Sequence, residues 1–126
     1  MLSKLFKVLG FIFAIFIAYG GVQHFLKAEF YLPFIPSILP FAMPIIYASG
    51  ILEVAFGVAY FIPKYRLIGA WGIFILMLIF LPIHLADVFI DAPAIGSKTA
   101  AYVRFPVQLL FIALSWKMVD MAKKNR

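Results

Sequence analysis

The 126-residue chain has no cysteine and little charge. Without cysteine, a disulfide, a dithiol redox motif and a thiolate metal site are all excluded. Charged residues make up 13% of the chain, whereas a soluble domain contains about 25%. Hydrophobic residues account for 66%, so few polar side chains remain to cover a surface that faces water. These proportions indicate that lipid surrounds most of the chain.

The sequence also lacks the short motifs of common enzymes and nucleotide-binding proteins. It contains no P-loop, no G-x-G-x-x-G and no local nucleophile–base arrangement. The net charge of +6 would suit a protein that binds nucleic acid. The cations, however, lie at the ends of apolar stretches, where they indicate membrane topology. Nucleic acid is therefore not an expected partner, whereas the lipid bilayer is.

Four apolar stretches are each long enough to cross a bilayer, which takes about 20 residues. The expected spans cover about residues 4–26, 44–62, 67–88 and 101–119. Together they place residues 1–126 in a single membrane domain. Lys4 and Lys7, before the first apolar run, favour a retained signal anchor. The expected fold class is all-α, an integral membrane four-helix bundle.

Prolines separate the first two predicted spans. Pro33, Pro36 and Pro40 fall within residues 27–43, and prolines at that density prevent a regular spanning helix. The same segment is poor in charge and rich in aromatic residues, which favour the membrane interface. We therefore expect a Pro-rich re-entrant or interfacial loop between helices 1 and 2, covering one end of the bundle.

The eleven lysine and arginine residues are distributed unevenly between the two ends of the predicted bundle. With the N-terminus inside, eight lie on the inner side, and three lie on the outer side: Lys27, Lys98 and Arg104. Because positively charged loops stay in the cytoplasm, this distribution places the N- and C-termini there. The chain is expected to be a multi-pass protein of the cytoplasmic membrane.

One carboxylate, Glu53, lies near the middle of the second span, with Ser49 one turn away on the same helix face. An ionisable side chain in a bilayer costs roughly 2.5–3.5 kcal/mol on insertion scales, so it should face protein or a cavity and have a partner. Nearly all the other polar side chains of the spans lie near their outer ends: Gln23, His24, His84, Asp87, Arg104 and Gln108. The pattern predicts one buried polar site in the outer half of the bundle, beneath the Pro-rich loop.

Each member of this predicted site has a structural alternative. Glu53 is either a ligand or proton site or a polar packing contact between helices. His24 and His84 suit interfacial hydrogen bonds, or a metal site with a carboxylate, but no local ligand motif supports a metal. Asp87 is either a site residue or a cap for a loop. Arg104 is either an interfacial cation or the counter-ion of an acidic residue or an anionic ligand.

Several short segments, in their order and spacing, resemble the DoxX family of small four-helix bacterial membrane proteins. The resemblance spans about residues 20–116 and is carried by residues 21–25 (GVQHF), 35–40 (IPSILP), 47–53 (YASGILE) with Gly57, 63–66 (PKYR), 80–82 (FLP) and 104–108 (RFPVQ). It implies an integral membrane fold in a bacterial inner membrane. The family-like polar positions are His24, Glu53, Arg104 and Gln108. Members often carry Asn where this chain has His84.

The resemblance also directs the functional prediction, because DoxX proteins are linked to quinone-coupled oxidation of sulfur compounds, to maturation of redox enzymes and to oxidative-stress complexes. The leading hypothesis is a quinone- or small-lipophile-binding subunit of a membrane redox system, at most part of a quinone-linked oxidoreductase. Glu53 or a histidine would handle protons, and Arg104 would stabilise an anionic form of the ligand. No covalently bound cofactor is expected.

Electrons in such a system would come from a redox or membrane-protein partner, and a homo-oligomer remains open. One alternative is a non-enzymatic scaffold or assembly factor, in which the polar cluster stabilises the bundle or grips a partner's helix. The other alternative is a small-solute transporter.

Overall fold

The structure, a computed structural model, describes residues 2–124. Within this range the chain is helical and contains no strand. Four long helices are joined by short helical turns: α1 (Leu2–Leu26), α2 (Ala28–Tyr31), η1 (Leu32–Phe34), α3 (Ala42–Phe61), η2 (Pro63–Tyr65), α4 (Arg66–Phe89) and α5 (Lys98–Lys124). The predicted all-α class is confirmed. Each long helix coincides with one predicted span, and the largest difference is at the end of α5, which reaches residue 124 instead of 119.

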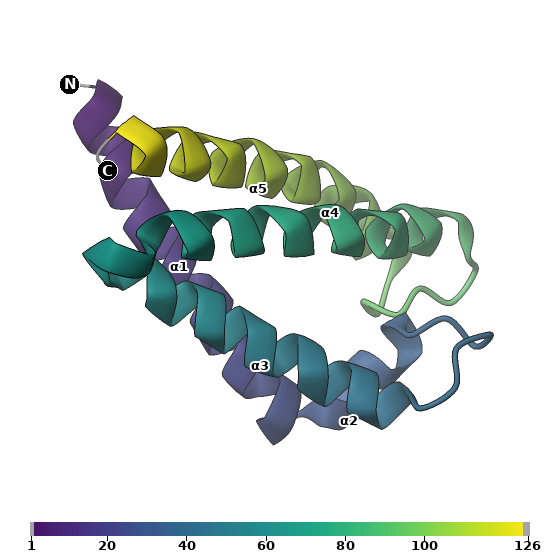
Figure 1. The fold of residues 1–126 in the computed structure, drawn as a ribbon. Helices are drawn as coiled ribbons and strands as arrows, with labels where there is room; N and C mark the ends of the chain where they lie inside the picture. Colours follow the sequence, from purple (N-terminus) through teal and green to yellow (C-terminus); the bar gives the residue numbers. More distant parts are fainter. Residues whose placement is uncertain (1, 125–126) are drawn as a thin grey trace.

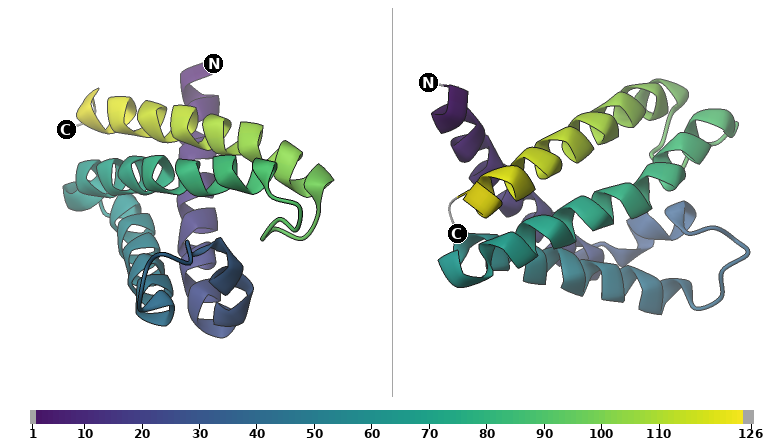
Figure 2. Two further views of the ribbon diagram at one scale, coloured as in Figure 1. Left: turned by 90° about the vertical axis from the view of Figure 1, so that its right-hand side faces the viewer. Right: turned by 45° about the horizontal axis from the view of Figure 1, so that its top comes forward.

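The long helices form two pairs that cross each other (Figure 1). α1 packs against α3, and α4 packs against α5. Seen from the side, α1 runs steeply across α4 and α5 (Figure 2). α3 and α4 meet at η2 and diverge from there, as the two arms of a V (Figure 1). The bundle is therefore splayed, and its open end is the end that holds α2, η1 and the loop before α5.

Glycines allow α1 and α3 to approach closely. A Cβ added to Gly21 would lie 2.5 Å from the backbone oxygen of Gly50. A Cβ added to Gly50 would lie 2.7 Å from the Cβ of His24. Real side chains do not tolerate such distances, so the two backbones can touch only where both residues are glycine. This contact holds the His24 end of α1 against α3.

The exterior of the long helices is mostly apolar. In the most apolar 18-residue window of each, only 22–28% of the residues are buried. Large side chains such as Ile12, Ile51 and Leu110 are more than half exposed. Exposing this surface to water would cost about 25 cal/mol of free energy for each Å² of apolar area. All four helices are long and apolar enough to cross a membrane, and these features indicate a helical membrane protein.

The Pro-rich segment contains only the short turns α2 and η1 before α3 begins at Ala42. Pro33 lies in the first turn of η1, where its missing N–H has no helical partner to lose. Phe41, just before α3, adopts a left-handed backbone conformation with φ of 61°. The segment between α1 and α3 is thus irregular, as the prolines predicted. Its relation to the membrane surface stays a prediction.

The glycine contact generates a stability prediction. Gly21→Ala should lower the free energy of unfolding by about 1–3 kcal/mol, because the new methyl group overpacks the α1–α3 contact. The matched control is Gly20→Ala, since a Cβ there meets nothing closer than an oxygen of Glu53 at 4.0 Å. That control should leave stability unchanged or raise it by up to about 1 kcal/mol, because alanine has the higher helix propensity. Unfolding in mixed detergent micelles measures both, and equal effects of the two variants would contradict the close approach.

Candidate ligand-binding site

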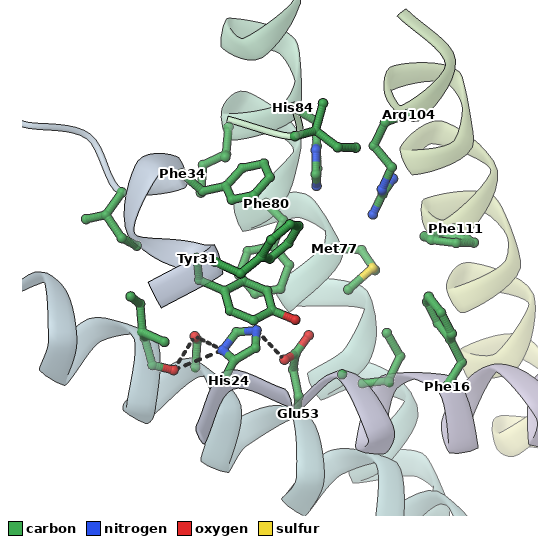
Figure 3. A pocket seen from close by; sticks show the side chains of 18 residues that line it. Phe16, His24, Tyr31, Phe34, Glu53, Met77, Phe80, His84, Arg104 and Phe111 are labelled. Carbon is green, nitrogen blue, oxygen red and sulfur yellow. Dashed lines mark hydrogen bonds and ion pairs between the residues drawn. The ribbon is translucent and has the colours of Figure 1, made fainter. Parts of the chain in front are cut away.

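A cavity of about 340 Å³ lies between the two helix pairs, at the splayed end of the bundle (Figure 3). All four long helices contribute to its wall, together with α2, η1 and the loop before α5. The wall is mostly apolar and is rich in aromatic rings: Phe16, Phe30, Tyr31, Phe34, Phe80 and Phe111. Sites for small organic molecules have volumes of about 300–1,000 Å³ and apolar walls with a few polar groups. The cavity meets both criteria.

An ion pair between α1 and α3 forms one polar wall of the cavity. Nε2 of His24 lies 3.0 Å from Oε2 of Glu53. The two residues are only 7% and 6% exposed. Their distance is that of an ion pair, although the oxygen is not aligned with the N–H as in a directed hydrogen bond. The partner that the sequence required for Glu53 is therefore His24.

The other imidazole nitrogen is anchored to the start of α3. Nδ1 of His24 lies 2.9 Å from the backbone oxygen of Ile46 and 2.9 Å from Oγ of Ser49. The Ser49 hydroxyl donates to the same carbonyl over 2.9 Å. When Nδ1–H donates to this carbonyl, Nε2 is left to share a proton with Glu53.

Tyr31 extends this polar wall from α2. Its ring lies against the imidazole of His24, with 4.1 Å between the ring centroids (Figure 3). Burial raises the pKa of the Tyr31 phenol, and the nearby charge of Glu53 raises it further. The phenol consequently stays protonated at neutral pH and remains a hydrogen-bond donor at the cavity wall.

A second polar wall lies opposite, where Arg104 of α5 points into the cavity beside His84 of α4 (Figure 3). Nη1 of Arg104 is buried and has no hydrogen-bond partner in the structure. None of the ion pairs among residues 2–124 involves this guanidinium. Its carbon lies 5.0 Å from the ring centroid of Phe111, a cation–π contact worth about 0.5–2 kcal/mol. Of the counter-ions expected for Arg104, the structure pairs it with neither Glu53 nor Asp87.

The structure brings five of the eight predicted site residues to the cavity wall: His24, Ser49, Glu53, His84 and Arg104. The side chain of Gln108 is fully buried between α4 and α5 instead, where Nε2 donates to the backbone oxygen of Met77 over 2.7 Å. Gln23 does not line the cavity, and its side-chain oxygen is buried without a partner. Gln108 thus joins α5 to α4, whereas neither Gln108 nor Gln23 contributes to the cavity wall.

Asp87 likewise holds the backbone instead of lining the cavity. Its carboxylate accepts hydrogen bonds from the backbone N–H groups of Ala94 and Ile95, over 2.6 and 3.2 Å. This is the loop-capping alternative that the sequence left open for Asp87. The bonds position Ile95, which does line the cavity. Among residues 2–124, no three His, Cys, Asp or Glu side chains are grouped closely enough to hold a metal ion.

Sequence reasoning missed the aromatic part of the site. Tyr31 and Phe34 come from the segment that was expected to cover the site, but no individual residue there was assigned to it. Phe80 and Phe111 belong to helices with many similar apolar residues, so their position alone carries no signal. The density of aromatic residues around the prolines was the one available indication.

The buried ion pair generates a second stability prediction. His24→Leu should cost about 3–5 kcal/mol, because it leaves the Glu53 carboxylate buried without a partner. Replacing both residues with leucine should recover most of this loss, since neither charge is then buried. Asp120→Asn is the control, because Asp120 pairs with Lys117 and Lys124 at an exposed site, where a pair contributes about 0–1 kcal/mol. A double-mutant cycle of unfolding free energies measures the coupling, and strictly additive losses at His24 and Glu53 would refute it.

Comparison with known proteins identifies a family but no activity. No match was found among curated proteins or among solved structures. A family model described as a domain of unknown function (DUF8561) matches residues 13–119, which is most of the chain. The resemblance to DoxX proteins stays a prediction. The protein belongs to the DUF8561 family.

Proposed function

We propose that the protein binds a lipophilic small molecule with an oxygen-bearing head, a quinone, as a subunit of a membrane redox system. One observation carries this proposal: an apolar cavity with the His24–Glu53 pair on one wall and Arg104 on the other. The quinone-linked roles implied by the resemblance to DoxX proteins favour the same ligand.

The residues present fit a quinone head. A flat ring matches the aromatic walls, where Phe80 and Phe111 offer ring faces and edges. The two oxygens of a quinone are hydrogen-bond acceptors on opposite sides of the ring, and the cavity has donors on opposite walls. Arg104 would hold one oxygen, and Tyr31 with His24 would hold the other. A bound quinone supplies reversible two-electron chemistry that is coupled to protons.

The protein's own contribution to that chemistry would be proton handling. Nε2 of His24 lies 3.0 Å from Oε2 of the Glu53 carboxylate, so the two groups would share one proton at the cavity wall. A pair of this kind can deliver a proton to a ligand oxygen and regain it, provided that the oxygen lies within hydrogen-bond distance. Electrons would come from, or go to, a partner protein or a soluble donor.

The splayed helices offer such a ligand a route from the lipid. Phe16 lines the cavity and is also 52% exposed, so it lies at the boundary between the cavity and the exterior. Its ring contacts that of Phe111 across the α1–α5 gap, with 5.6 Å between the centroids. α1 and α5 have far less contact with each other than the helices within each pair. A hydrophobic tail would leave the cavity through this gap.

The proposed location is the cytoplasmic membrane of a bacterium, with both termini in the cytoplasm. The cation-rich start of α1, η2 and the end of α5 lie at one end of the fold (Figure 1). A cluster of positive charge at one end favours the cytoplasmic side. The cavity would then open in the outer half of the membrane.

A scaffold or assembly role is the second candidate, and one observation favours it. The bonds from His24 to Ile46, Ser49 and Glu53 join α1 to α3 without any ligand. In that case the polar wall would serve the stability of the bundle. Ligand binding therefore has to be measured apart from stability.

The quinone proposal is tested by binding of decylubiquinone to purified protein in nanodiscs, followed by calorimetry and native mass spectrometry. The wild type should bind the quinone, and Glu53→Gln should weaken binding by about tenfold or more, because the carboxylate that supports a charged, donating His24 is lost. Glu29→Gln is the matched control, since Glu29 is an exposed acid of α2 outside the cavity. A folded wild type that binds no quinone would contradict the proposal and favour the scaffold role.

The proposed orientation is tested with single cysteines, because the chain has none of its own. Asp91→Cys lies in the loop before α5, and Lys64→Cys lies in η2 at the opposite end; both positions are exposed. A membrane-impermeant maleimide should label Asp91→Cys in spheroplasts and Lys64→Cys only after lysis. The reverse labelling pattern would show that the termini lie outside.

A further inference from the structure

Among residues 2–124, no counter-ion in the cavity pairs with the positive charge of Arg104. Glu53 is the only acidic residue that these residues place on the wall, and its charge is already matched by His24 when the pair is ionised. His84 beside the guanidinium brings no negative charge. The cavity wall as a whole therefore carries about one uncompensated positive charge, on a group whose Nη1 is buried without a partner.

No other acidic side chain in the described part of the chain pairs with Arg104. The sequence contains five acidic residues in all. Besides Glu53, Asp87 directs its carboxylate at two backbone N–H groups instead of at Arg104, and Asp120 pairs with lysines near the end of α5. Glu29 and Asp91 are exposed. No ion pair or hydrogen bond joins any of these acids to Arg104 in the described part of the chain.

We propose that the site selects a lipophile whose aromatic or quinonoid head carries one ionised hydroxyl group, an enolate or a phenolate. The inference rests on the proposed function and narrows its ligand class. An unpaired charge in an apolar environment is strongly disfavoured, and a bound anion would remove that penalty. The guanidinium of Arg104 is suited to an oxyanion because it can donate two parallel N–H groups.

The remaining features of the cavity restrict the ligand further. A small inorganic anion would neutralise Arg104 but leave the aromatic walls uncovered. A neutral quinone would cover these walls but leave the charge in place. The ring faces of Phe80 and Phe111 and the exit beside Phe16 suit a flat head with an apolar tail. An ionised hydroxyl on a ring satisfies both requirements at once.

A matched pair of probes tests this inference on the whole protein in nanodiscs. The first probe is a 2-hydroxy-3-alkyl-1,4-naphthoquinone, whose acidic enol is ionised at neutral pH. The second is its 2-methoxy analogue, which has the same ring and tail but cannot ionise. Calorimetry should show at least about tenfold tighter binding of the hydroxy probe by the wild type, because a hydrogen bond to a charged group contributes more than a neutral one.

Two variants test whether the guanidinium of Arg104 causes the preference for the hydroxy probe. Arg104→Met should abolish the preference for the hydroxy probe while the methoxy probe still binds. Lys27→Met is the control, because it removes an exposed cation at the same end of the fold without touching the cavity. That variant should keep the full preference. If Arg104→Met does not fold, the probe pair with the wild type still decides the question.

The possible results separate the two proposals. Equal binding of both probes to the wild type would overturn the selectivity for an anion and leave quinone binding intact. Binding of neither probe by folded protein would overturn both. Dodecanoate, a fatty acid without a ring, is included as a third probe. If it binds more tightly than the hydroxy probe, and if this binding depends on Arg104, the inference that the ligand has an aromatic or quinonoid head would be wrong.

Discussion

The buried contact between His24 and Glu53 depends on how closely α1 and α3 approach, and the arrangement of the site follows from it. Gly21 and Gly50 let the two backbones touch, so that the imidazole reaches both the carbonyl of Ile46 and the carboxylate of Glu53. A carboxylate in an apolar helix requires such a partner, because isolated charge is poorly tolerated away from water. Helix packing and electrostatics therefore support each other here.

The same close packing explains why a cavity exists. Each helix pair is held along its length, α1 with α3 by glycine contacts and α4 with α5 in part by the bond from Gln108 to Met77. The pairs cross instead of running parallel, so they touch at one end and separate at the other (Figure 1). The gap is covered by α2, η1 and the loop that Asp87 holds. The space enclosed by these elements is the cavity.

The two polar walls differ in a way that bears on function. The wall of His24 and Glu53 is internally paired, with 3.0 Å between Nε2 and Oε2. On the opposite wall, Nη1 of Arg104 is buried without a hydrogen-bond partner. An apolar space between a proton donor and a cation is suited to a ring that carries oxygens on both sides. The structure thus combines the ordinary packing of a helical membrane protein with one asymmetric polar site.

The local pattern of the sequence determined the four helices, the irregular Pro-rich segment and the need of Glu53 for a partner, because chain length, proline and the cost of buried charge act locally. It also indicated which polar residues gather at one end of the bundle. Only the tertiary structure decided that His24 is the partner of Glu53, that Arg104 is left unpaired, and that Asp87 and Gln108 hold the backbone. These outcomes depend on the crossing of the helix pairs, and side-chain contacts between distant segments are not encoded in the spacing along any one helix.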